Sequence, residues 1–391
     1  MLRRYKLKNY NFRLVLWILV LSAIGVILVG SAMKSLQMRQ LAGVIGGVVL
    51  MVIVSLMDFS WILNFYWVIY GANIVLLLLL IPLGSEQLGA TRWISIGGFQ
   101  FQPTELSKIF LILFFAQYLM KHEDDLNTLK TILTSVVLLA VPLVLILIQP
   151  DLKNTITVAV VFCFLMYMAG LSYKIIGGIL GVVIPVGVVL MILITQTDLP
   201  IIQDYQKTRI MAWLNPEDAE YSDDIIQQQN SITAIGSGQL TGKGLNNNEV
   251  ASVNKGNFVS QNHNDFIFAV AGEEMGFLGC CLIILLLFMV VFECIRTGSR
   301  AKNLSGTLIC AGVGSMVGFQ SFLNICVATG LFPNTGTPLP FVSYGLTSLW
   351  TLYISMGFVL NVGLQDISYL NKNRNNLKGD RNKHERRINR T

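Results

Sequence analysis

The sequence predicts an all-α integral membrane protein with about ten transmembrane helices and a large extracellular loop between helices seven and eight. Composition is the first reason, because 53% of the 391 residues are hydrophobic and only 13% are charged, well below the roughly 25% typical of soluble domains. Apolar runs long enough to cross a bilayer also recur along the chain. These runs are continuous, as in a helix, and do not alternate like the strands of a membrane barrel.

The predicted spans place both chain ends on the same side of the membrane. They cover 14–33, 40–57, 61–83, 104–119, 131–149, 152–171, 175–195, 265–292, 304–332 and 344–365. The N-terminal tail (1–13), the C-terminal tail (366–391) and the link between spans eight and nine are rich in lysine and arginine. The positive-inside rule therefore predicts that both tails are cytoplasmic and flank one membrane domain, residues 14–365.

The opposite side would carry three segments, 84–103, 196–264 and 333–344. A structureless loop as long as 196–264 is improbable in a compact protein. Its apolar residues predict a helix lying in the membrane interface: Tyr205, Ile210, Met211, Trp213 and Leu214. The glycines between Gly236 and Gly244 suggest either backbone amides that approach an anionic group or flexible turns.

Cofactor and nucleic-acid sites find little support in the sequence. The six cysteines fall in or beside the spans and the three histidines are widely separated, so a metal held by side chains alone is not predicted. The basic C-terminal tail is expected from topology and from anionic membrane lipids. Nucleic acid is therefore not an expected partner.

Ionisable residues at the membrane edge are the candidates for chemistry, since their burial in lipid is costly. Glu105 and Lys108 share a helix face, either as a structural pair or as a site. Asp151 follows a proline that would expose the carboxylate externally, and helix capping is its alternative role. Asp265 could cap span eight, and Glu273 would lie roughly 12 Å deeper, too far to form a glycosidase-type carboxylate pair with it unless the helix is broken. A single base, Asp265, is therefore predicted.

Several of these residues form motifs that resemble the family of shape, elongation, division and sporulation proteins, to which RodA, FtsW and SpoVE belong. The matching segments are 92–94, 102–108, 149–152, Arg209, 242–245, His263, 265–268, 272–274 and 338–345. Residues 234–238 and the Gly-Lys-Gly that follows resemble RodA more than FtsW. The chain departs from the family pattern at Lys153, Asn154, Ser260, Gln261, Asn264, Asn334, Thr337 and Leu346.

The resemblance implies a peptidoglycan glycosyltransferase of the bacterial cell membrane that polymerises lipid II with a class B penicillin-binding protein as its partner. In our hypothesis Asp265 is the general base that activates the acceptor hydroxyl, with inversion at the donor carbon. Cationic residues would hold the leaving pyrophosphate, and a divalent cation (Mg or Mn) could share that role. These candidates are Arg92, Lys108, Arg209 and Lys243, and the further substrate-binding candidates are Glu105, Asp151, His263 and Ser343.

Two other classes of function are compatible with the same features. A flippase or transporter of the lipid-linked precursor would also need intramembrane charge and helices broken by proline or glycine. A non-catalytic scaffold for wall-synthesis enzymes would tolerate the departures from the family pattern.

Overall fold

Membrane helices dominate the computed structural model, which describes residues 9–87, 90–96, 99–178, 181, 185, 204–214, 222–245 and 263–365. Seven described helices are long and apolar enough to cross a membrane. They are α1 (Phe12–Ala32), α2 (Lys34–Leu56), α4 (Tyr66–Leu83), α6 (Leu129–Ile148), α11 (Ile267–Gly298), α12 (Leu304–Ala328) and α13 (Leu346–Leu364). The predicted class, an all-α membrane protein, is confirmed.

Three more helices belong to the same bundle. Helices α5 (Pro103–Lys121) and α7 (Leu152–Met168) correspond to the fourth and sixth predicted spans, and the short α3 (Phe59–Leu63) precedes α4. Nearly all of α5 is buried, and it packs against α4, α7 and α12. Because protein surrounds α5, this helix can hold charged side chains that lipid would exclude. The predicted span 175–195 lies mostly outside the described residues.

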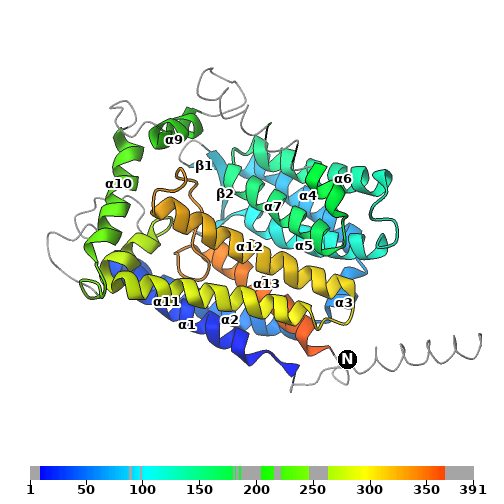
Figure 1. Ribbon diagram of the computed structural model, residues 1–391, viewed down its shortest axis with the longest axis horizontal. Helices are drawn as coiled ribbons and strands as arrows, with labels where there is room; N and C mark the ends of the chain where they lie inside the picture. Colours follow the sequence, from blue (N-terminus) through cyan, green and yellow to red (C-terminus); the bar gives the residue numbers. More distant parts are fainter. Residues whose placement is uncertain are drawn as a thin grey trace, which may run out of the picture.

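The bundle is held together by close contacts between backbones. Helix α2 packs along α13, while α11 packs against α1 and α12 (Figure 1). At Gly25 in α1 an added Cβ would lie 2.8 Å from the backbone oxygen of Phe341. At Gly357 in α13 it would lie 2.8 Å from the backbone oxygen of Met51. Small residues at such points let membrane helices gain packing contacts where lipid offers no hydrophobic driving force.

The loops of predicted external location gather at one end of the bundle. Figure 1 shows α9 (Asp204–Leu214) and α10 (Ser222–Ser237) at the left end, with α3 and the start of α1 at the other. The helix predicted from the apolar residues of the long loop corresponds to α9. Helix α10 has no counterpart in the prediction; it packs against α11.

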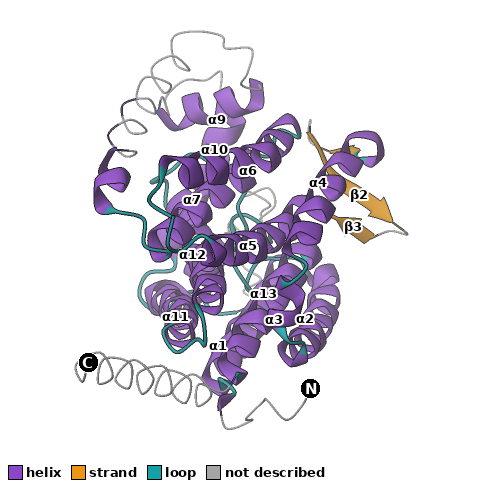
Figure 2. Ribbon diagram, turned by 90° about the vertical axis from the view of Figure 1, so that its right-hand side faces the viewer, coloured by secondary structure: helices purple, strands orange, loops and turns teal. Residues whose placement is uncertain are grey.

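A small antiparallel sheet replaces the loop expected at 84–103 (Figure 2). Strands β1 (Ser85–Gln87), β2 (Ala90–Ile96) and β3 (Phe99–Phe101) pair in chain order, with Ile94 opposite Phe101. Aromatic and β-branched residues favour such strands, and β3 leads directly into α5. The sheet therefore fixes where Arg92 and the start of α5 lie.

The glycine-rich stretch after α10 docks on α11 and does not present all its amides to a ligand. The backbone amide of Lys243 donates to the carbonyl of Glu273 at 2.9 Å, and that of Gly244 to the carbonyl of Glu274 at 3.1 Å. Those carbonyls are available because α11 is interrupted at Gly276, which has φ 66°. For these two amides the predicted contact with an anion is wrong.

Candidate active site

Asp265 lies where the start of α11 meets the proline-rich segment 333–345. The side chain of Asn324, from α12, donates 2.7 Å hydrogen bonds to the backbone oxygens of both Asp265 and Thr337. Phe266, which follows Asp265, is fully buried, whereas Asp265 itself is half-buried. Residue 266, not 265, caps α11 and does so without a side-chain hydrogen bond, so the predicted capping role of Asp265 is wrong.

Three charged side chains from distant parts of the chain converge on Gly336. A Cβ placed on this glycine would lie 3.3 Å from Asp265 Oδ2 and 4.0 Å from Arg209 Nη1. The Lys153 ammonium donates a 2.6 Å hydrogen bond to the Gly336 carbonyl, and Arg209 Nη1 donates at 3.4 Å to the carbonyl of Asn334. The structure thus brings together one carboxylate and two cations.

The carboxylate of Asp265 has lone pairs available for a ligand. This carboxylate accepts no hydrogen bond from the described residues. Arg209 Nη1 also lies near Gly336, but it donates to the carbonyl of Asn334 and not to the Asp265 carboxylate. Glu105, Glu273 and Glu293 differ, because each is paired with a lysine or arginine. Asp265 therefore has the accepting capacity that a general base requires.

His263 and Ser343, both predicted to bind substrate, tie the loop before α11 to the proline-rich segment. Ser343 Oγ donates to the carbonyl of Asn264 at 2.6 Å, and the amide of Tyr344 donates to the carbonyl of His263 at 2.9 Å. Burial lowers the pKa of His263 below its usual value, although the nearby Asp265 charge opposes this shift. A neutral imidazole beside Asp265 is the result at neutral pH.

Glu105 and Lys108 form the pair that their spacing predicts, but they lie inside the protein. Lys108 Nζ is 2.9 Å from Glu105 Oε2, and both residues are 2% exposed. Lys108 is therefore enclosed by other helices in this structure, and its contact with a pyrophosphate stays a prediction.

Asp151 is fully buried. The interpretation in which its carboxylate is exposed externally is therefore wrong, and the alternative, helix capping, is confirmed. Asp151 caps α7 through the Asn154 amide, and its Oδ2 accepts from Gln102 and Thr104 at 3.0 Å each. Burial raises the pKa of Asp151, but nearby positive charge and hydrogen bonds lower it by a larger amount. The pKa of Asp151 therefore lies below its usual value. The positive charges are those of Lys153 and Arg92.

Arg92 and Lys243 are each engaged within the protein. Arg92 Nη2 hydrogen-bonds the carbonyl of Pro150, which anchors β2 beside the start of α7. Lys243 Nζ pairs with Glu273 Oε1 at 2.9 Å, and the glutamate is 1% exposed. The break at Gly276 lies beyond Glu273, and α11 is regular from Ile267 to Met275, so the separation of Glu273 from Asp265 along the helix stays a prediction.

Lys153 is the site residue that the sequence prediction missed. In the sequence it stands out as a departure from the family pattern, and a lysine in the first turn of a membrane helix is itself a costly feature that signals function. A divalent cation would find one carboxylate here, and no group of three His, Cys, Asp or Glu side chains comes together within the described ranges. Asp265 therefore fits Mg²⁺ only in a site that substrate phosphates complete.

Comparison with known sequences identifies relatives across most of the chain. The chain is similar to the probable peptidoglycan glycosyltransferase FtsW of Geobacter sulfurreducens, with 31% identity covering 91% of this chain and 96% of the relative. It is 33% identical to the protein of the same name from Escherichia coli O157:H7, covering 76% of this chain and 70% of the relative.

Solved structures give the same grouping. A chain from a structure described as coordination of polymerization and crosslinking by a peptidoglycan synthase complex superposes with a TM-score of 0.74 and 26% identity, covering 90% of this chain and 97% of that one. The rod shape determining protein RodA of Thermus thermophilus gives 0.66 and 25%, covering 90% and 96%. The model of the FtsW/RodA/SpoVE family, described as cell cycle protein, matches residues 8–367. The chain belongs to the FtsW/RodA/SpoVE family of membrane proteins.

Proposed function

We propose that this protein is a peptidoglycan glycosyltransferase that polymerises lipid II at the outer face of the bacterial cytoplasmic membrane. The observation that carries the proposal is the half-buried Asp265 carboxylate, which accepts no hydrogen bond from a described residue and shares the surroundings of Gly336 with Arg209 and Lys153. The names of the relatives support the same activity.

In this mechanism Asp265 accepts the proton of an acceptor-sugar hydroxyl. The hydroxyl oxygen then forms a bond to the anomeric carbon of the donor sugar, while the bond from that carbon to the lipid-linked pyrophosphate breaks. The pyrophosphate leaves with the electron pair, and the configuration at carbon inverts. One base on the attacking side is sufficient for this displacement.

Charge on the leaving group must be offset on the other side of the reacting carbon. Arg209 and Lys153 are placed to do this because both reach the backbone of segment 334–336. Preorganised cations of this kind act where charge develops in the transition state. A divalent cation, when bound, would polarise the phosphate oxygens further. Arg92, Lys108 and Lys243 are less direct candidates, because their contacts lie within the protein.

The proposal includes a partner and an orientation. A class B penicillin-binding protein would crosslink the strands, which the similarity to a chain of a peptidoglycan synthase complex supports. With both termini cytoplasmic, α9, α10 and the Asp265 site lie at the outer end of the bundle, where lipid-linked substrate and growing strand meet. The chain is similar both to FtsW and to the rod shape determining protein RodA, so assignment to elongation, as the RodA-like motifs suggest, is part of this proposal.

The decisive experiment supplies lipid II to the purified protein and its partner, with crosslinking inhibited, and analyses the products for glycan strands. Wild type and Asp124→Ala, which removes an exposed carboxylate between α5 and α6, should make strands, whereas Asp265→Ala should not. Translocation of lipid II across sealed vesicles without strands would instead favour the flippase. Partner binding with neither activity would favour the scaffold.

A further inference from the structure

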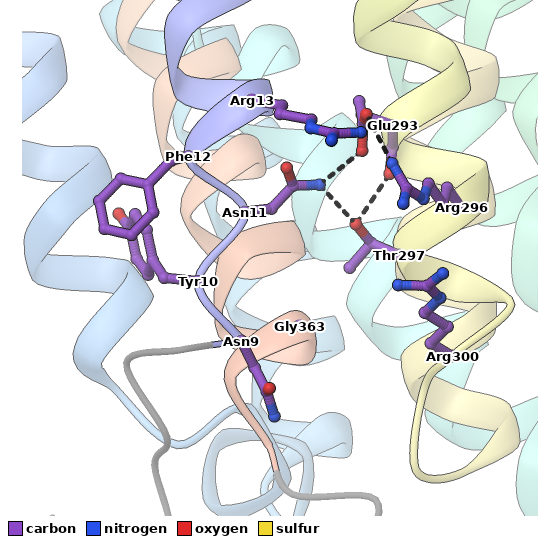
Figure 3. Close-up of a pocket in the computed structure, with 10 residues that line it drawn as sticks. All are labelled: Asn9, Tyr10, Asn11, Phe12, Arg13, Glu293, Arg296, Thr297, Arg300 and Gly363. Atoms are coloured by element: carbon purple, nitrogen blue, oxygen red, sulfur yellow. Dashed lines mark hydrogen bonds and ion pairs between the residues drawn. The ribbon is translucent and has the colours of Figure 1, made fainter.

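A basic pocket opens at the end of the bundle opposite the Asp265 site. It has a volume of about 460 Å³ and lies between the start of α1, the end of α11 and the end of α13. Three arginines contribute to its lining: Arg13, Arg296 and Arg300. Figure 3 shows their guanidinium groups lying around the pocket, with Glu293 as the carboxylate among them. The lining thus carries two more positive than negative side chains.

The internal bonds of the pocket use only part of this positive charge. Arg296 Nη1 pairs with Glu293 Oε1 at 3.2 Å, and the Asn11 side chain donates to Glu293 Oε2 at 2.9 Å. The guanidinium groups of Arg13 and Arg300 make no hydrogen bond or ion pair with the residues that the structure describes. Arg13 and Arg300 are both exposed, so their donors are available to a ligand that displaces water.

We propose that this pocket binds a phosphate group, with the headgroup of an anionic phospholipid as its source. The forked donors of arginine match phosphate oxygens, and basic pockets between membrane helices on the cytoplasmic side bind anionic headgroups. The positive end of the α1 dipole faces the pocket, as do the negative ends of the α11 and α13 dipoles, so the attraction for an anion comes from the arginines.

The surface next to the pocket suits the acyl chains of such a lipid. Phe288, Phe292 and Arg296 follow one another at four-residue spacing, so they share one face of α11. Phe288 is 59% exposed and Phe292 is 48% exposed. Phe12, on the pocket rim, is 67% exposed, and an aromatic ring is favoured at the level of the headgroups. A soluble phosphate has no acyl chain and would gain nothing from the apolar surface that Phe12, Phe288 and Phe292 form.

The test measures binding of phosphatidylglycerol to the full-length protein by native mass spectrometry, with phosphatidylcholine as the neutral lipid. Arg13→Gln/Arg300→Gln should weaken phosphatidylglycerol binding by about tenfold or more. The matched control is Lys130→Gln/Lys174→Gln, which removes two exposed positive charges outside the pocket, one at the start of α6 and one after the end of α7. This control should stay within about twofold of wild type, as expected for screened surface charge.

Glu293→Gln guards against a loss of binding that merely reflects misfolding. This change removes the competing carboxylate and frees Arg296, so it should tighten phosphatidylglycerol binding, a gain that a damaged protein would not show. Titration with inorganic phosphate distinguishes the source. Arginine-dependent binding of inorganic phosphate that phosphatidylglycerol cannot displace would assign the pocket to a soluble anion. Equal lipid binding by the arginine and lysine double variants, with no gain for Glu293→Gln, would overturn the proposal.

Discussion

Lys153 brings a positive charge into the first turn of α7, where it bonds the carbonyl of Gly336 and lowers the pKa of Asp151. The pairing of Glu105 with Lys108 could be predicted from the sequence, because three-residue spacing on one helix fixes it locally. The meeting of Lys153 with Gly336 could not, since 183 residues separate them along the chain. Local geometry is encoded in spacing, whereas this contact depends on how α7 packs against the segment before α13.

Replacing Lys153 with methionine tests its role in offsetting charge on the leaving group. Lys153→Met should lower the rate of glycan synthesis by about tenfold, because one preorganised cation is lost from the transition state. The melting temperature should change little, since Lys153 is only partly buried. The control Lys174→Met removes an exposed lysine elsewhere. Equal rates for the two variants would show that Lys153 has no part in the reaction.

The lowered pKa of His263 predicts a pH dependence of stability. Because the pKa in the folded protein lies below the ordinary value of about 6.5, the unfolded chain takes up the proton first as pH falls. The neutral imidazole therefore contributes stability that is complete above about pH 6.5 and is lost as pH falls through the folded-state pKa. The fall in melting temperature between pH 7.5 and pH 5.5 should be smaller for His263→Gln than for wild type. An identical fall in both proteins would contradict this assignment.

At the scale of elements, the contact between the glycine-rich stretch and α11 shows where sequence patterns are ambiguous. Closely spaced glycines predicted close approach of a backbone, and the approach is real, but the backbone that comes near is that of residues 272–276. The strands and α10 were missed for a related reason: short or weakly amphipathic segments acquire their structure from packing on neighbours. Long apolar helices were predicted well because their length alone identifies them.

Gly242→Ala tests this docking contact. An added Cβ would collide with the backbone oxygen of Glu274, and the glycine has φ 82°, so the variant should lose roughly 1–3 kcal/mol of stability. Gly236→Ala is the control, because its Cβ would meet nothing within 4 Å. The measurement is the thermal midpoint in detergent. A midpoint for Gly242→Ala equal to that of the control would mean that the contact does not form.

At the scale of the whole molecule, the bundle keeps a charged site at one end and a basic pocket at the other. Helix α5, enclosed by α4, α7 and α12, forms the interior of the bundle. The family and the membrane class could be predicted from motifs and composition. The arrangement of the site could not, because it joins α7, α9, the start of α11 and segment 333–345, which meet only in the folded protein.

The central claim, that Asp265 is the base for sugar transfer, is tested most directly by the initial rate of lipid II consumption by Asp265→Asn in complex with its partner. Asparagine keeps the size of the side chain but cannot accept the proton as a carboxylate does. The rate should fall by about 100-fold or more, with partner binding and melting temperature unchanged. A rate within about threefold of wild type, well short of the loss expected for a missing general base, would contradict the account.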